Sequence, residues 1–148
     1  MSLVVAVVVI MAVAGMMIFF SKNPFNPLST PLKHSIVDDN ITVNAGSYAS
    51  YNFSLSNSGN VYPTVTGTFI ASSEESMERP LIRVFVMTYA NFTAWQNDNS
   101  AGTIYDSAFV HNGDITANLP NGNYVLVYDN TFDSISKTVN TVVYTFQV

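Results

Sequence analysis

The sequence predicts an all-β protein: an antiparallel β-sandwich with jelly-roll or immunoglobulin-like topology, preceded by one N-terminal transmembrane helix. Short alternating apolar runs from residue 35 onward, separated by Gly, Pro and Asn turns at roughly 8–12-residue spacing, predict about eight strands. That spacing leaves no room for the crossover helices of a parallel sheet. Residues 3–20 carry no polar or charged side chain. The length of this apolar segment is at the lower limit for a membrane-spanning helix.

The N-terminal segment, residues 1–21, is interpreted as an uncleaved membrane anchor. An Asn-Pro pair ending at Pro24 stops the helix. Ala12 and Ala14 form a small-x-small pattern typical of signal-peptide cleavage, but the residues after it stay apolar, which favours an anchor. Ala12 and Gly15 are candidates for close packing against another helix, although small residues are also common in membrane helices that do not pack this way.

The remaining chain divides into a Pro-rich linker, residues 22–34, and a β-sandwich domain, residues 35–148. Lys22 follows the anchor and weakly favours a cytoplasmic domain. The low charge of the domain and its many Asn, Ser and Thr residues favour an extracytoplasmic location, a composition typical of archaeal or bacterial surface proteins. We therefore expect a single-pass protein of the cell membrane with its domain outside.

Three N-x-Ser/Thr sequons strengthen that expectation. They begin at Asn40, Asn52 and Asn91, which are candidate glycosylation sites. Because Asn is abundant in this chain, some sequons are also expected by chance.

The strands are predicted from runs of apolar or alternating residues. Those runs are 35–43, 48–55, 61–69, 81–89, 103–110, 114–119, 123–128 and 138–148. The run 81–89 is apolar almost throughout, which predicts a central strand. A short helical turn is expected at 91–97, with Trp95 facing inward. Turns are predicted at 111–113 and 120–122.

Composition excludes several functions. The chain has 5 basic residues and a net charge of −5, which argues against nucleic-acid binding. It has no cysteine, which excludes disulfides, thiolate zinc sites and cysteine nucleophiles. His34 and His111 lie in predicted loops outside any metal-binding or triad motif, so two solvated histidines are favoured over a metal pair. We predict no catalytic residue, no cofactor and no metal, and no enzyme activity.

Two acidic groups have alternative interpretations. Asp129, Asn130 and Asp133 follow a strand and offer oxygen ligands for Ca²⁺, but such residues are also ordinary turn formers, and the turn is favoured.

The other group is the acidic loop with Glu74, Glu75 and Glu78. It is a solvated loop or, less favoured, an interface for a basic partner.

Trp95 is a core residue or, less favoured, an interface or glycan-binding residue.

Several stretches resemble a known sandwich pattern. They are GSY at 46–48 leading into YNFSL at 51–55, VTGTF at 65–69, GDITA at 113–117 and LPNGNYVLVYDN at 119–130. Together they resemble the GOLD (p24-like) domains and the pre-peptidase C-terminal sandwich modules. The resemblance implies a sandwich that makes protein–protein contacts and carries no chemistry. GOLD domains of the p24 type have an inter-sheet disulfide, which this chain lacks. The hydrophobic helix followed by a sandwich also resembles archaeal type IV pilins.

The leading hypothesis is a non-catalytic accessory subunit of a larger membrane complex. Integral-membrane subunits would contact residues 3–20 and the sandwich, within the lipid bilayer and above it. The first alternative is a subunit of a cell-surface filament, like an archaeal pilin or flagellin, assembled by self-association. The second alternative is a surface module that binds glycan or Ca²⁺, with Trp95 and Asp129 as its candidate residues.

Overall fold

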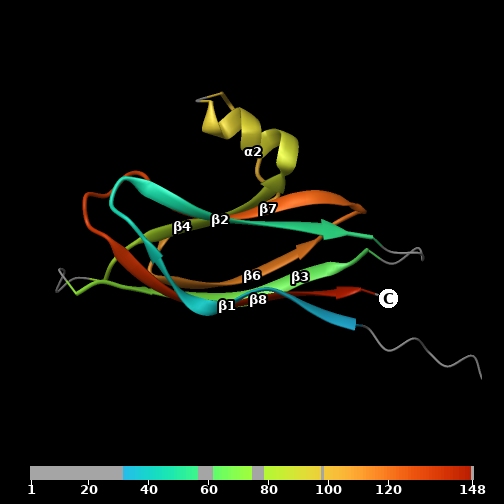
Figure 1. Ribbon diagram of the computed structural model, residues 1–148, viewed down its shortest axis with the longest axis horizontal. Coiled ribbons are helices and arrows are strands. Elements are labelled where there is room, and N and C mark those ends of the chain that lie inside the picture. Colours follow the sequence, from blue (N-terminus) through green and yellow to red (C-terminus); the bar gives the residue numbers. More distant parts are fainter. Residues whose placement is uncertain (1–31, 57–61, 75–78, 98, 148) are drawn as a thin grey trace, which may run out of the picture. The chain divides into compact units, whose positions relative to one another are not determined.

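Eight strands form two antiparallel four-stranded sheets, with one short helix on the outside of the second sheet (Figure 1). The structure is a computed structural model that describes residues 32–56, 62–74, 79–97 and 99–147. The elements are β1 (Leu32–Val43), β2 (Ser47–Leu55), β3 (Thr64–Ser72), β4 (Ile82–Thr88), α2 (Tyr89–Gln96), β5 (Tyr105–Val110), β6 (Asn112–Asn118), β7 (Gly122–Asn130) and β8 (Lys137–Gln147). The predicted all-β sandwich of eight strands is confirmed.

The strand order identifies a jelly-roll-like arrangement. One sheet has the order β1-β8-β3-β6 and the other β2-β7-β4-β5. The strands pair in the order of one long hairpin whose two halves run side by side. β1 pairs with β8, β2 with β7, β3 with β6 and β4 with β5. In addition, β3 pairs with β8 and β4 pairs with β7. These two pairings join the strand pairs into two four-stranded sheets, the arrangement of a double-sheet jelly roll.

The core lies between the sheets and follows the alternation of the strands. In β3, Val65 and Phe69 are buried on the same face as Gly67, as the sequence predicts. In β2, Tyr51 and Phe53 lie half-buried against the same core. This face is mostly apolar, and the buried hydroxyl of Thr141 on β8 has the Tyr128 hydroxyl as its partner.

A second, smaller core lies on the outer face of the second sheet. Phe85 of β4 and Val127 of β7 are buried there beneath Phe92 and Trp95 of α2. Thr88 caps α2 by accepting a hydrogen bond from the Asn91 backbone N–H at 3.2 Å. The strand β4 is thus buried on both faces, which explains its continuous apolar run and confirms its predicted central position.

The predicted transmembrane helix lies outside the described residues, as do Ala12 and Gly15. Among the residues that the structure describes, no helix is long and apolar enough to cross a membrane. The first strand begins at Leu32, within the range that the sequence assigns to the linker.

Gly67 gives a test of the packing between β3 and β8. A Cβ at this position would lie 2.2 Å from the Val142 carbonyl oxygen and 2.7 Å from the Val143 Cα, both backbone atoms of the paired strand. We predict that Gly67→Ala lowers the free energy of unfolding by about 3 kcal/mol, because the ladder has to shift to admit a methyl group. Thermal unfolding followed by circular dichroism measures this loss.

Gly102→Ala is the matched control, since a Cβ there meets only the Asn91 Nδ2 atom, at an ordinary 3.5 Å. We expect a change within about 0.5 kcal/mol for this control. Equal effects of the two substitutions would contradict the packing argument.

Candidate functional site

One end of the sandwich exposes apolar side chains where the described chain begins. Leu32, Tyr62 and Phe146 are 65%, 66% and 39% exposed. They share this end because Leu32 pairs with Gln147, and Phe146 pairs with Thr64, two residues after Tyr62. We call this end, with Leu32, Tyr62, Tyr144 and Phe146, the N-terminal pole.

The charges at the N-terminal pole are basic. The Lys33 Nζ lies 3.9 Å from the centroid of the Tyr144 ring, and Tyr144 meets Phe146 edge-on at 5.2 Å. Lys33 and His34 lie in β1 next to Leu32, and none of the described residues at these strand ends is acidic. A cation among aromatic rings is the chemistry typical of residues at a membrane–water interface.

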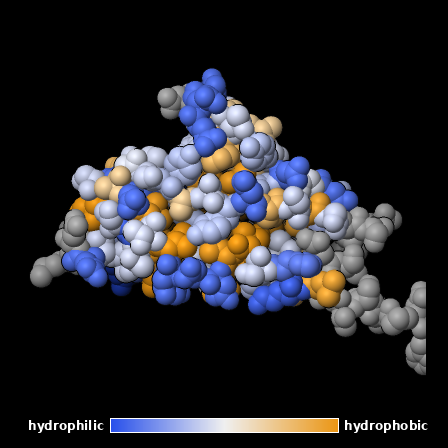
Figure 2. All heavy atoms as spheres, viewed as in Figure 1, coloured by the Kyte–Doolittle hydropathy of each residue, from blue (hydrophilic) through white to orange (hydrophobic). Residues whose placement is uncertain are grey.

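Hydrophobic atoms also reach the surface along the side of the sandwich. Figure 2 shows them (orange) between the two sheets, bordered by hydrophilic residues. A hollow of about 370 Å³ opens beside β2 and β7, lined by Asn52, Phe53, Ser54, Tyr89, Asn123 and Tyr124. Its walls combine amide groups with the stacked Phe53 and Tyr124 rings, 5.6 Å apart.

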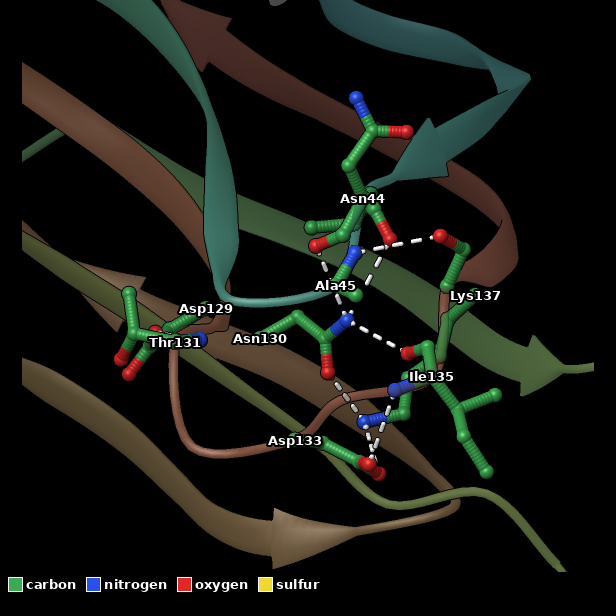
Figure 3. A network of polar contacts seen from close by, with 10 residues as sticks. Asn44, Ala45, Asp129, Asn130, Thr131, Asp133, Ile135 and Lys137 are labelled. Atoms are coloured by element: carbon green, nitrogen blue, oxygen red, sulfur yellow. Dashed lines mark hydrogen bonds and ion pairs between the residues drawn. The ribbon is translucent and has the colours of Figure 1, made fainter.

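The opposite end holds a polar group, which we call the Lys137 cluster: the buried Asn130 and Lys137 and the partly exposed Asp133 (Figure 3). The Lys137 side chain is fully buried. Its Nζ donates to the Asn130 Oδ1 and pairs with the Asp133 Oδ2 at 2.9 Å. The hydrogen bond from Lys137 lowers the pKa of the Asp133 carboxyl, which is therefore ionised at neutral pH.

Asn130 ties the Lys137 cluster to the turn between β1 and β2. Its Nδ2 lies within hydrogen-bond distance of the carbonyl oxygens of Val43 (3.3 Å), Asn44 (3.1 Å) and Ile135 (2.9 Å). Gly46, at φ 64°, donates its N–H to the Asp133 carbonyl at 2.8 Å. The cluster thus fastens two loops from different parts of the chain.

The turn interpretation of Asp129, Asn130 and Asp133 fits this geometry. Asp129 Oδ1 accepts the Thr131 N–H at 2.9 Å, and Asp133 Oδ1 accepts the Ile135 N–H at 3.1 Å, as in Asx turns. The cation beside Asn130 and Asp133 is the Lys137 side chain. Within the described ranges, no group of three His, Asp or Glu side chains is placed to hold a metal ion.

The other predicted residues are dispersed. His34 lies in β1 at the N-terminal pole, whereas His111 joins β5 to β6 near the opposite end, so the fold does not bring them together. Trp95 is half-buried against Tyr48 and Phe85, with ring centroids 5.0 and 5.2 Å away. Glu74 is exposed, and Glu75 and Glu78 lie outside the described residues.

The three sequons differ in accessibility. Asn40 and Asn52 are exposed on β1 and β2. Asn91 is half-buried in α2, and its Nδ2 donates to the Gly102 carbonyl at 2.8 Å. The Nδ2 atom of Asn91 is therefore engaged by the backbone, and Asn40 and Asn52 are the more exposed sequons.

Sequence reasoning missed Lys137 and the N-terminal pole. Lys137 stands at the start of an alternating strand, where a solvated lysine is the ordinary expectation, and only its proximity to Asn130 marks it as unusual. Tyr62 and Phe146 are far apart in sequence, and the pairing of β3 with β8 brings them to the same end of the sheet. The exposed edge-on pair of Phe109 and Phe132, 4.5 Å apart, was missed for the same reason.

No protein-family model matches the chain, and no curated protein matches it. The two-sheet jelly-roll-like fold is therefore the extent of the resemblance that is supported, and the GOLD and pilin resemblances stay predictions.

The Arg83–Asp106 pair predicts how stability responds to acid. Arg83 donates to both Asp106 carboxylate oxygens, at 3.0 and 2.5 Å, and these bonds lower the pKa of Asp106. The carboxylate stabilises the fold above its ordinary pKa of about 3.9, and this contribution is lost as pH falls through the lower pKa of the folded state. We predict that the free energy of unfolding declines on acidification below about pH 4 and declines less in Asp106→Asn.

Urea unfolding at a series of pH values measures this effect. Asp133 titrates in the same direction and remains in the variant, so part of the decline persists. An identical decline in both proteins would mean that the Arg83–Asp106 pair contributes nothing to the acid response.

Proposed function

We propose that this protein is a non-catalytic accessory subunit of a membrane complex, with its β-sandwich held against the outer face of that complex. The observation that carries the proposal is the N-terminal pole: exposed Leu32, Tyr62 and Phe146 beside Lys33, on an end without acidic residues among those described. The chain leads from this pole toward the apolar segment 3–20 through a short Pro-rich stretch.

The chemistry of the pole supports contact with a membrane-embedded partner. Apolar side chains left in water are unfavourable by about 25 cal/mol per Å² of exposed area, and covering them recovers that free energy. Lys33 matches anionic headgroups or acidic side chains of a partner.

Native electrophoresis with mass spectrometry tests this function. The protein is extracted with mild detergent from its own membrane, and we expect multi-span proteins to co-migrate with it at fixed stoichiometry. The triple variant Leu32→Ser, Tyr62→Ser, Phe146→Ser is expected to lose most of this co-migration, because the covered apolar surface is gone.

The matched control is Ile70→Ser with Phe109→Ser, which removes exposed apolar side chains elsewhere on the domain. Co-migration is expected to survive in this control. A wild-type protein that runs alone as a monomer contradicts the proposal, and a ladder of this chain alone assigns it to a filament instead.

A second candidate function is glycan binding at the hollow lined by Asn52, Tyr89 and Tyr124. Aromatic faces and amide groups are the side chains that bind sugar rings and hydroxyls, and Tyr89 is 53% exposed beside them. We expect Tyr89→Ala to abolish any glycan signal on an array, whereas Phe109→Ala, 50% exposed outside the hollow, leaves it unchanged. A wild-type protein that binds no glycan removes this candidate.

A further inference from the structure

Lys137 is a primary amine buried where charge is costly. Its side chain has no exposed surface, and its Nζ contacts the side chains of Asn130 and Asp133 (Figure 3). A lysine amine is a nucleophile once deprotonated, a side-chain amide has an electrophilic carbon, and a carboxylate accepts protons. The Lys137 cluster thus places side by side the three groups that an amide exchange requires.

Asn130 is held in one orientation for such a reaction. Its side chain is buried, and its Nδ2 faces the carbonyl oxygens of Val43, Asn44 and Ile135 at 2.9 to 3.3 Å. Carbonyl oxygens accept hydrogen bonds from an amide N–H and equally from a departing ammonia. Fixing nucleophile and electrophile in contact makes the reaction unimolecular, which raises its rate by many orders of magnitude.

We propose that Lys137 and Asn130 join in an intramolecular isopeptide bond that the folded protein forms by itself. The Asp133 carboxylate accepts one proton from the Nζ ammonium, and the resulting amine attacks the Asn130 Cγ. The Nζ–Cγ bond forms, a second proton passes from Nζ to Nδ2, the Cγ–Nδ2 bond breaks and ammonia leaves. The proton on Asp133 then leaves with the ammonia as ammonium. No oxidant or cofactor enters this balance.

The surroundings favour this bond over hydrolysis of the amide. Lys137 and Asn130 are both shielded from solvent. The Phe132 ring lies 4.6 Å from the Lys137 Nζ and is itself packed edge-on against Phe109, so it screens the amine on the outside. Each chain reacts only once, so a slow step is sufficient.

The bond would link the two sheets covalently. Asn130 ends β7 in one sheet, and Lys137 begins β8 in the other. The chain has no cysteine and therefore no disulfide. An amide between these side chains would do in this domain what a disulfide does elsewhere: it fixes the corner at which β7, β8 and the β1–β2 turn meet.

Intact-mass spectrometry of the denatured full chain tests this inference. We expect the wild type to weigh one ammonia less than its sequence requires, after any glycan is accounted for. Proteolysis should yield a branched peptide in which residues 130 and 137 remain joined, and fragmentation of that peptide locates the bond. A wild type of unreduced mass overturns the inference, as does an ammonia loss located at other residues.

Variants separate the reaction from mere contact. Asp133→Ala removes the base, and we expect the mass of this variant to show no loss of ammonia. The matched control is Asp106→Ala, since Asp106 is also paired with a basic side chain and is equally exposed, at 31%. The mass of this control should be lower by one ammonia, as we expect for the wild type. Full bond formation in Asp133→Ala refutes the role of Asp133, and the wild-type peptide map decides the bond itself even if that variant fails to fold.

Discussion

The face-to-face packing of the two sheets is the constraint on which the rest of the structure depends. The inner strands β7 and β4 pack across the core from β8 and β3, and the Tyr128 hydroxyl meets the Thr141 hydroxyl at 2.6 Å in this buried layer. Burial raises the pKa of Tyr128, which favours its neutral hydroxyl form. The Lys137 cluster depends on this packing, because Asn130 ends a strand of one sheet and Lys137 begins a strand of the other, whereas the N-terminal pole is assembled by pairing within one sheet.

The two ends of the domain differ in chemistry. The N-terminal pole combines exposed aromatic rings with Lys33, whereas the opposite end buries its one lysine and binds its loops through hydrogen bonds. The first is suited to being covered by another surface, the second to holding its own shape.

Much of the fold was predictable from local patterns. The alternation around Val65 and Phe69, the continuous apolar run of β4 and the helix carrying Trp95 each report which faces are buried. Strand partners were not predictable, since Asn40 and Asn140 pair across one hundred residues. The sites depend on those partners. The sequence predicts Asn130 and Asp133 as turn formers, and the structure agrees. No pattern in the neighbouring sequence indicates that the Lys137 side chain packs against them.

Both ends of the described chain belong to neighbouring strands, because β1 and β8 pair from Leu32 opposite Gln147 to Val43 opposite Lys137. Because of this arrangement, the resistance of the domain to tension depends on the direction of pulling. Tension applied between its first and last residues would peel β1 from β8 one hydrogen-bonded pair at a time, which takes little force. Tension between the first residue and the far end of the sandwich would load the whole ladder in shear. The domain thus resists tension toward the far end of the sandwich far better than tension between its first and last described residues.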